Sequence, residues 1–101
     1  MPSQSVDEHL YIVAYDIAEP RRWRRVFKLM NGYGEWLQLS VFQCRLTQRR
    51  RVELVAALNE VIHHNQDHVL VLDLGSVDRV ELRVISLGKA YAPVTREPII
   101  V

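Results

Sequence analysis

The sequence has few of the features that small proteins use in place of a hydrophobic core. It contains one cysteine, Cys44, which excludes an internal disulfide framework and offers no set of zinc ligands. Secreted chains of this size more often carry paired cysteines, so we expect a cytoplasmic protein. No run approaches the ~20 apolar residues of a membrane span. The first residues, MPSQSVDEHL, lack the basic and apolar stretches of a signal peptide.

Internal repeats, linkers and low-complexity segments are also missing. The 101 residues are therefore expected to form one domain over 1–101, with a loose polar leader over residues 1–8. Cys44 is expected to be a small buried side chain.

The net charge is small, at +1, but the charges are unevenly distributed. Residues 21–51 contain nine Lys or Arg and one acid, Glu35, which gives +8. Residues 52–101 contain four basic and seven acidic residues, which gives −3. A concentrated positive field beside a weakly acidic remainder is typical of a protein that binds a polyanion. A solvated helix face is the alternative, and charge alone does not decide between the two.

Hydrophobic periodicity predicts an alternation of strands and helices. Residues 9–15 are apolar with few polar breaks, as in a central strand. Pro20 suits the first turn of a helix that runs to about Asn31. The remaining predicted elements are one long strand or two short strands over 35–46, a helix over 48–63, and strands over 67–75 and 80–87 joined as a hairpin.

This order of elements predicts an α+β fold. A ferredoxin-like sandwich, with two helices on one face of a largely antiparallel sheet and a C-terminal strand, fits it best. In the first helix, Trp23, Val26, Phe27 and Met30 share one stripe and are expected in the core. The candidate nucleic-acid-binding residues are the cations of the two helices: Arg21, Arg22, Arg24, Arg25, Lys28, Arg49, Arg50 and Arg51.

Asp16 ends the first predicted strand, directly before the basic helix. A polar residue in this place can belong to a functional site or can cap the following turn, and the sequence leaves both open. One carboxylate makes a poor magnesium site, because Mg²⁺ takes one or two carboxylates together with waters and substrate phosphate oxygens. A twofold dimer would supply Asp16 twice. The arginines would then hold a phosphate backbone near the metal.

Several segments together resemble the second CRISPR-associated protein family, which contains small adaptation nucleases. The resemblance covers about residues 9–88. The segments are the strand end Tyr15-Asp16-Ile17, GEWLQLSVFQCRL over residues 34–46, and Asp67 followed by a strand that ends at Leu74-Gly75.

The resemblance implies a ferredoxin-like homodimer in which Asp16 of each subunit holds Mg²⁺ or Mn²⁺ and is catalytic. It implies metal-dependent endonuclease activity on RNA or DNA. It also implies a scaffold role, in which the dimer binds duplex DNA and bridges CRISPR integrase subunits. By position, Tyr15, Ser40 and Phe42 fall in the family motif, and Arg22 or Arg25 falls in its basic helix start.

The chain departs from the family at two positions. Many members have Arg where this chain has Trp36, and Glu where it has Gln43. The first change removes a possible phosphate contact, and the second removes a possible second carboxylate. Trp36 is expected to pack or stack instead.

Other functions stay open on the sequence alone. The same scaffold without catalysis and a stand-alone ribonuclease toxin of a related ferredoxin-like family are two of them. A single-strand RNA-binding sheet domain is disfavoured, because its glycine-aromatic strand motif is absent. The histidines predict no metal cluster, since His63 and His64 are adjacent and point apart on a helix, and His68 follows it.

The last residues predict a dimer contact. Ile99, Ile100 and Val101 are apolar and follow Pro98, which belongs at the start of a strand or on a sheet edge. Such an end would pair with an exposed sheet edge of the other subunit, and the resemblance implies the same for residues 89–101. Packing of this tail on its own subunit is the alternative.

Overall fold

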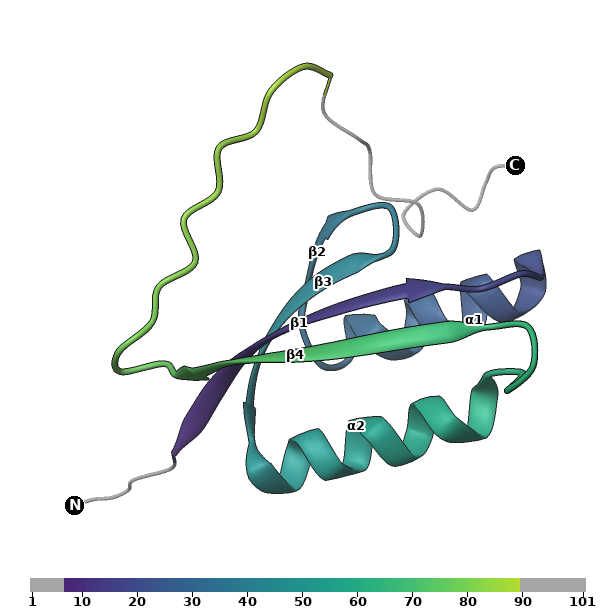
Figure 1. The fold of residues 1–101 in the computed structure, drawn as a ribbon, viewed down its shortest axis with the longest axis horizontal. Coiled ribbons are helices and arrows are strands. Elements are labelled where there is room, and N and C mark those ends of the chain that lie inside the picture. The colour runs from purple at the N-terminus through teal and green to yellow at the C-terminus, as the bar shows by residue number, and fades with distance from the viewer. Residues whose placement is uncertain (1–6, 90–101) are drawn as a thin grey trace.

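The computed structural model describes residues 7–89, which form a four-stranded sheet with two helices against one side (Figure 1). The ferredoxin-like α+β class predicted from the sequence is confirmed. Most of the leader and the apolar tail Ile99, Ile100 and Val101 lie outside the described residues. Within residues 7–89, no helix has the length and apolar character needed to cross a membrane.

The four strands form one antiparallel sheet, and a side-chain cap marks the start of the second helix. The sheet order is β2-β3-β1-β4, and every neighbouring pair of strands is antiparallel. Thr47 caps the second helix by accepting a hydrogen bond from Arg50 N. The elements are β1 (Glu8–Asp16), α1 (Pro20–Asn31), β2 (Glu35–Gln38), β3 (Val41–Thr47), α2 (Gln48–Val61) and β4 (His68–Ser76).

The alternating segment 35–46 forms two strands rather than one. They are joined at Leu39, whose φ of 40° lies in the left-handed region that most residues avoid. Trp36 Nε1 donates a hydrogen bond to Leu39 O at 2.9 Å, which holds this turn closed. Trp36 also packs edge-on against Phe27, with ring centroids 6.0 Å apart. The packing role expected for Trp36 is therefore confirmed.

The predicted hairpin between 67–75 and 80–87 is wrong. β4 forms, but residues 80–89 contain no strand and leave the sheet as an extended segment (Figure 1). Arg79 N and Val80 N both donate to Ser76 O, which makes a helix-like turn and not the two-residue reversal of a hairpin. Val84, Ile85 and Leu87 of the segment are exposed, up to 87% at Ile85.

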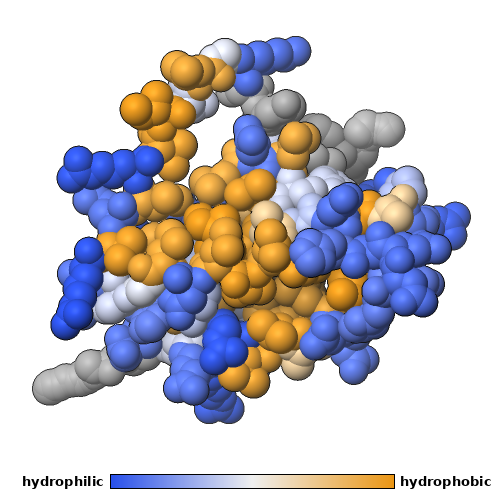
Figure 2. Space-filling model, viewed as in Figure 1, coloured by the Kyte–Doolittle hydropathy of each residue, from blue (hydrophilic) through white to orange (hydrophobic). Residues whose placement is uncertain are grey.

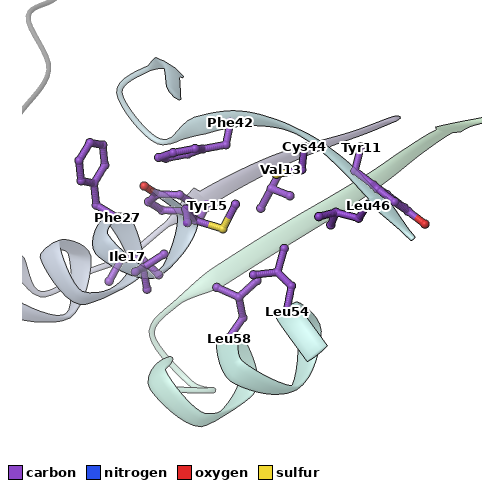
Figure 3. Close-up of a cluster of buried hydrophobic side chains, with 12 residues drawn as sticks. Tyr11, Val13, Tyr15, Ile17, Phe27, Phe42, Cys44, Leu46, Leu54 and Leu58 are labelled. Carbon is purple, nitrogen blue, oxygen red and sulfur yellow. The ribbon is translucent and has the colours of Figure 1, made fainter. Parts of the chain in front are cut away.

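The core lies between the sheet and the two helices (Figure 3). The expected stripe of α1 is confirmed, since Val26, Phe27 and Met30 are buried and Trp23 packs partly buried against them. Cys44 is buried as predicted, and burial raises the pKa of its thiol to about 11. The other buried members are Tyr11, Val13, Tyr15, Ile17, Phe42, Leu46, Leu54 and Leu58.

The opposite side of the sheet carries no helix among residues 7–89. Ile12 and Ala14 of β1 stand opposite Leu72 and Leu70 of β4, and alternation points all four away from the core. We call this side the open face. Leu70 and Leu72 are 47% and 46% exposed, and Leu74 is 40% exposed. Figure 2 shows the resulting apolar surface over the sheet.

Candidate nucleic-acid and metal site at the end of the first strand

Asp16 is the last residue of β1, and its side chain is exposed. Because Tyr15 points into the core, alternation places Asp16 on the open face together with Ile12 and Ala14. The side chain makes no hydrogen bond or ion pair with any of residues 7–89. A free carboxylate at a strand end is thus available to a ligand.

Glu19, and not Asp16, caps the basic helix. Glu19 Oε1 accepts a hydrogen bond from Arg22 N at 2.7 Å, and Pro20 occupies the first helical turn. This bond to the backbone N–H of Arg22 is the main reason that the pKa of Glu19 lies below its ordinary value. The capping alternative for Asp16 is therefore not realised at this helix.

The motif residues Tyr15, Ser40 and Phe42 hold the end of β1 against the β2–β3 turn. Tyr15 N donates to Ser40 O at 3.1 Å, and Ser40 Oγ accepts from Trp23 Nε1 at 2.7 Å. The rings of Tyr15 and Phe42 stack with centroids 6.3 Å apart. Burial raises the pKa of Tyr15, and its hydroxyl is buried without a partner among the described residues. These contacts assign the three residues a structural role.

Asp67 is a functional residue for which the sequence offers no signal beyond the family resemblance. Its fully shielded carboxylate accepts hydrogen bonds from Ala18 N at 2.9 Å, His63 N at 2.7 Å and Arg22 Nε at 2.7 Å. It thereby ties the loop after Asp16 to α1 and to the connection between α2 and β4. The Arg22 guanidinium is the main reason that the pKa of Asp67 lies far below its usual range. No local pattern predicts this clamp, because its partners are far apart in the sequence.

Asp67→Asn is expected to lower the melting temperature by roughly 5–10 °C at pH 7, because hydrogen bonds to a charged group contribute about 1.5–3 kcal/mol in general. A carboxyl whose pKa is depressed by folding stabilises the fold above its unfolded pKa, and this contribution is lost as the pH falls. The difference between wild type and Asp67→Asn should therefore shrink below about pH 4. Urea unfolding over pH 7 to 3 measures it, with the exposed Asp78→Asn as control. A difference that is independent of pH would contradict the clamp.

The predicted cations fall into two groups. Arg22 is bound to Asp67 and its side chain is only 18% exposed, so it is not available to bind a phosphate. The Arg50 guanidinium carbon lies 4.4 Å from the centroid of the Tyr33 ring. Arg49 Nε lies 3.5 Å from Glu53 Oε2. Arg51 is half-buried. The exposed cations of α1 without an ion pair among residues 7–89 are Arg21, Arg24, Arg25 and Lys28, which we call the α1 cations.

A single chain does not complete a metal site in the part that the structure describes. No group of three or more His, Cys, Asp or Glu side chains gathers there. Gln43 Nε2, at the position where many family members have Glu, donates to Glu35 Oε1 at 2.9 Å. Asp16 fits the role of one oxygen ligand among several, and a second chain would have to supply the next one.

Comparisons with known proteins match this chain to one protein family. Residues 9–81 match the family model of CRISPR associated protein Cas2. The chain is 56% identical to the CRISPR-associated endoribonuclease Cas2 of Geobacter sulfurreducens, over 93% of this chain and 99% of that protein. It is 55% identical to a CRISPR-associated endoribonuclease Cas2 of Rhodospirillum rubrum, over 93% and 92%.

Solved structures show the same fold. Streptococcus pyogenes Cas2 at pH 6.5 superposes with a TM-score of 0.69 and 31% identity, over 78% of this chain and 99% of that one. A hypothetical protein from Thermus thermophilus superposes with a TM-score of 0.71 and 30% identity, over 82% and 96%. Since the family model spans most of the chain and the relatives match it nearly end to end, the chain belongs to the CRISPR-associated protein Cas2 family.

Proposed function

We propose that this chain is a CRISPR adaptation subunit that binds duplex nucleic acid as a homodimer and cleaves RNA or DNA with a divalent metal held by Asp16 of both subunits. The observation that carries the proposal is the position of Asp16 on the open face. A twofold contact between two open faces, with its axis along the strands, would bring two free carboxylates to one end of the interface. Relatives named endoribonucleases support the hydrolytic activity.

The open face supports the homodimer. Leu70, Leu72 and Leu74 are partly exposed there, and a contiguous apolar surface of this kind marks an interaction site. A twofold axis through this face makes the contact self-complementary. The outer edge of β4 has no strand beside it among residues 7–89. The exposed apolar segment 80–89 of a second chain would cover that edge, and the tail 99–101 belongs to the same proposal.

The chemistry proposed for Asp16 is that of a hard oxygen ligand. Mg²⁺ or Mn²⁺, when bound, supplies an activated water for in-line attack on phosphorus and neutralises the phosphate charge. The α1 cations would hold the phosphate backbone, and the Asp67 clamp would keep the loop after Asp16 in place. In the adaptation complex, the same dimer would bridge CRISPR integrase subunits on duplex DNA.

A second candidate function is the same scaffold without catalysis. It is favoured by Gln43, which donates its amide to Glu35 where many family members have a second carboxylate. In this version Asp16 is an interface residue, and DNA binding stays as proposed. The cleavage activity of an Asp16 variant separates the two functions.

Duplex binding is expected to depend on the α1 cations. Changing Arg21, Arg24 and Arg25 together to Ala should flatten the dependence of log affinity on log salt by roughly 0.9 for each phosphate that the variant no longer neutralises. Fluorescence anisotropy with a short labelled DNA duplex, over a series of salt concentrations, measures the slope. Arg79→Ala, an exposed arginine outside both helices, is the control. An unchanged slope in the triple variant would return these residues to a solvated helix face.

A further inference from the structure

His68 stands directly opposite Asp16 in the sheet. β1 and β4 pair antiparallel, with Asp16 opposite His68, Ala14 opposite Leu70 and Ile12 opposite Leu72. Residues opposite each other on antiparallel strands point to the same face, with Cβ atoms about 4.5–5.5 Å apart. Asp16 and His68 therefore form the last cross-strand pair on the open face, which we call the Asp16–His68 rung.

The two side chains of this rung have no other partner among residues 7–89. Both are exposed, and neither makes a hydrogen bond or ion pair with that part of the chain. The other histidines differ: His9 Nδ1 bonds the Asp73 carboxylate at 2.9 Å, His63 Nδ1 accepts from Asn65 N, and His64 Nε2 bonds Asn59 O. Within residues 7–89, His68 is thus the histidine whose imidazole is free for a ligand.

A carboxylate and an imidazole also lie close together at the opposite end of the sheet, but there they bind each other. There the His9 imidazole and the Asp73 carboxylate meet and satisfy each other. At the Asp16 end the carboxylate and imidazole share a face but do not pair within 4.0 Å. Two unpaired ligand groups on one rung can converge on a third atom.

We infer that His68 is a second metal ligand in each chain, so that the dimer offers two carboxylates and two imidazoles to one divalent ion. The inference rests on the proposed open-face dimer, which brings the Asp16–His68 rungs of two chains together. Imidazole nitrogen suits transition-metal ions, whereas Mg²⁺ prefers oxygen ligands. The mixed ligand set therefore favours a transition-metal ion such as Mn²⁺ over Mg²⁺.

The inference depends on the register of β4 against β1, because the spacing of residues in the sequence does not show on which face His68 lies. A one-residue slip of β4 against β1 would turn His68 to the core side. The slip is excluded because Val69 and Val71, which alternate with His68, pack against the core and stand opposite Tyr15 and Val13.

Metal binding by the full-length dimer tests the inference without any nuclease assay. The signal of free Mn²⁺ in electron paramagnetic resonance gives the Mn²⁺ affinity, and competition gives the Mg²⁺ affinity. His68→Ala is expected to weaken Mn²⁺ binding roughly 10-fold or more and to change Mg²⁺ binding little. His68→Gln, which keeps the size of the side chain, should behave in the same way. His64→Ala is the matched control and should bind both ions as wild type does.

The outcomes separate the ligand assignment from the proposed function. Asp16→Asn should lose both ions. If His68→Ala binds Mn²⁺ as tightly as wild type while Asp16→Asn does not, His68 is not a ligand and the Asp16 site stands. Equal losses of Mn²⁺ and Mg²⁺ in His68→Ala would also overturn an imidazole ligand. A wild-type dimer that binds neither ion would overturn this inference and the proposed metal site together. Sedimentation and circular dichroism verify that each variant is a folded dimer.

Discussion

Asp16→Asn is expected to reduce metal-dependent cleavage of a nucleic-acid substrate by roughly 100-fold or more, since outer-shell changes at metal sites already cost 10–100-fold. The amide keeps the size of the carboxylate but loses its charge, and a hard divalent cation prefers charged oxygen ligands. Asp16 is exposed and its side chain makes no hydrogen bond within residues 7–89, so the substitution should leave the fold and the dimer unchanged.

The measurement is a cleavage time course on labelled RNA and DNA, with Mg²⁺, with Mn²⁺ and with chelator. Glu60→Gln, an exposed carboxylate change on α2, is the matched control and should cleave as wild type does. Equal cleavage by Asp16→Asn and wild type would mean that the activity does not belong to this site. No metal-dependent cleavage by the wild type, combined with tight duplex binding, would favour the non-catalytic scaffold.

Leu72→Glu is expected to convert the proposed dimer to a monomer at micromolar concentration, with a dissociation constant raised by about 100-fold or more, because a charge buried at an apolar interface lacks a partner. Leu72 lies opposite Ile12 in the middle of the open face and is 46% exposed in one chain. Nearly half of Leu72 is already exposed, so the substitution removes only part of its packing within the monomer.

Sedimentation velocity over a concentration series measures this change. Val52→Glu places the same charge on α2, where Val52 is 51% exposed, and should remain dimeric. Because the proposed metal site needs two chains, Leu72→Glu should also lose Mn²⁺ binding. A Leu72→Glu chain that stays as dimeric as wild type would place the dimer contact elsewhere on the surface.

Local patterns in the sequence predict the elements that depend on neighbouring residues. Pro20 and the apolar stripe predict α1 with the bounds that the structure has, and the end of the apolar run at Asp16 is the end of β1. The alternation over 35–46 does not distinguish one strand from two, because a turn at Leu39 preserves the alternation on both sides. The hairpin after β4 fails because β propensity over 80–87 does not show whether a partner strand is available to the segment.

Patterns in the sequence do not predict contacts between residues that are far apart in the chain. Charge alone groups Arg22 with its neighbours, whereas the fold pairs it with Asp67 at 2.7 Å. His68 has no apparent role until the register of β4 places it beside Asp16. In each case the decisive partner is separated by a turn or by many residues, and a periodic pattern contains no information about it.

The unpaired outer edge of β4 has a consequence for the chain while it is being synthesised. Among residues 7–89, this strand has free N–H and C=O groups beside partly exposed Leu70, Leu72 and Leu74, and such an edge is a template for any extended polypeptide that it meets. In the proposed dimer a second copy covers this edge, so a newly made subunit would be exposed to aggregation until that copy arrives. The rate at which two copies meet in the cell would then determine how long this edge stays uncovered, independently of how stably each copy folds.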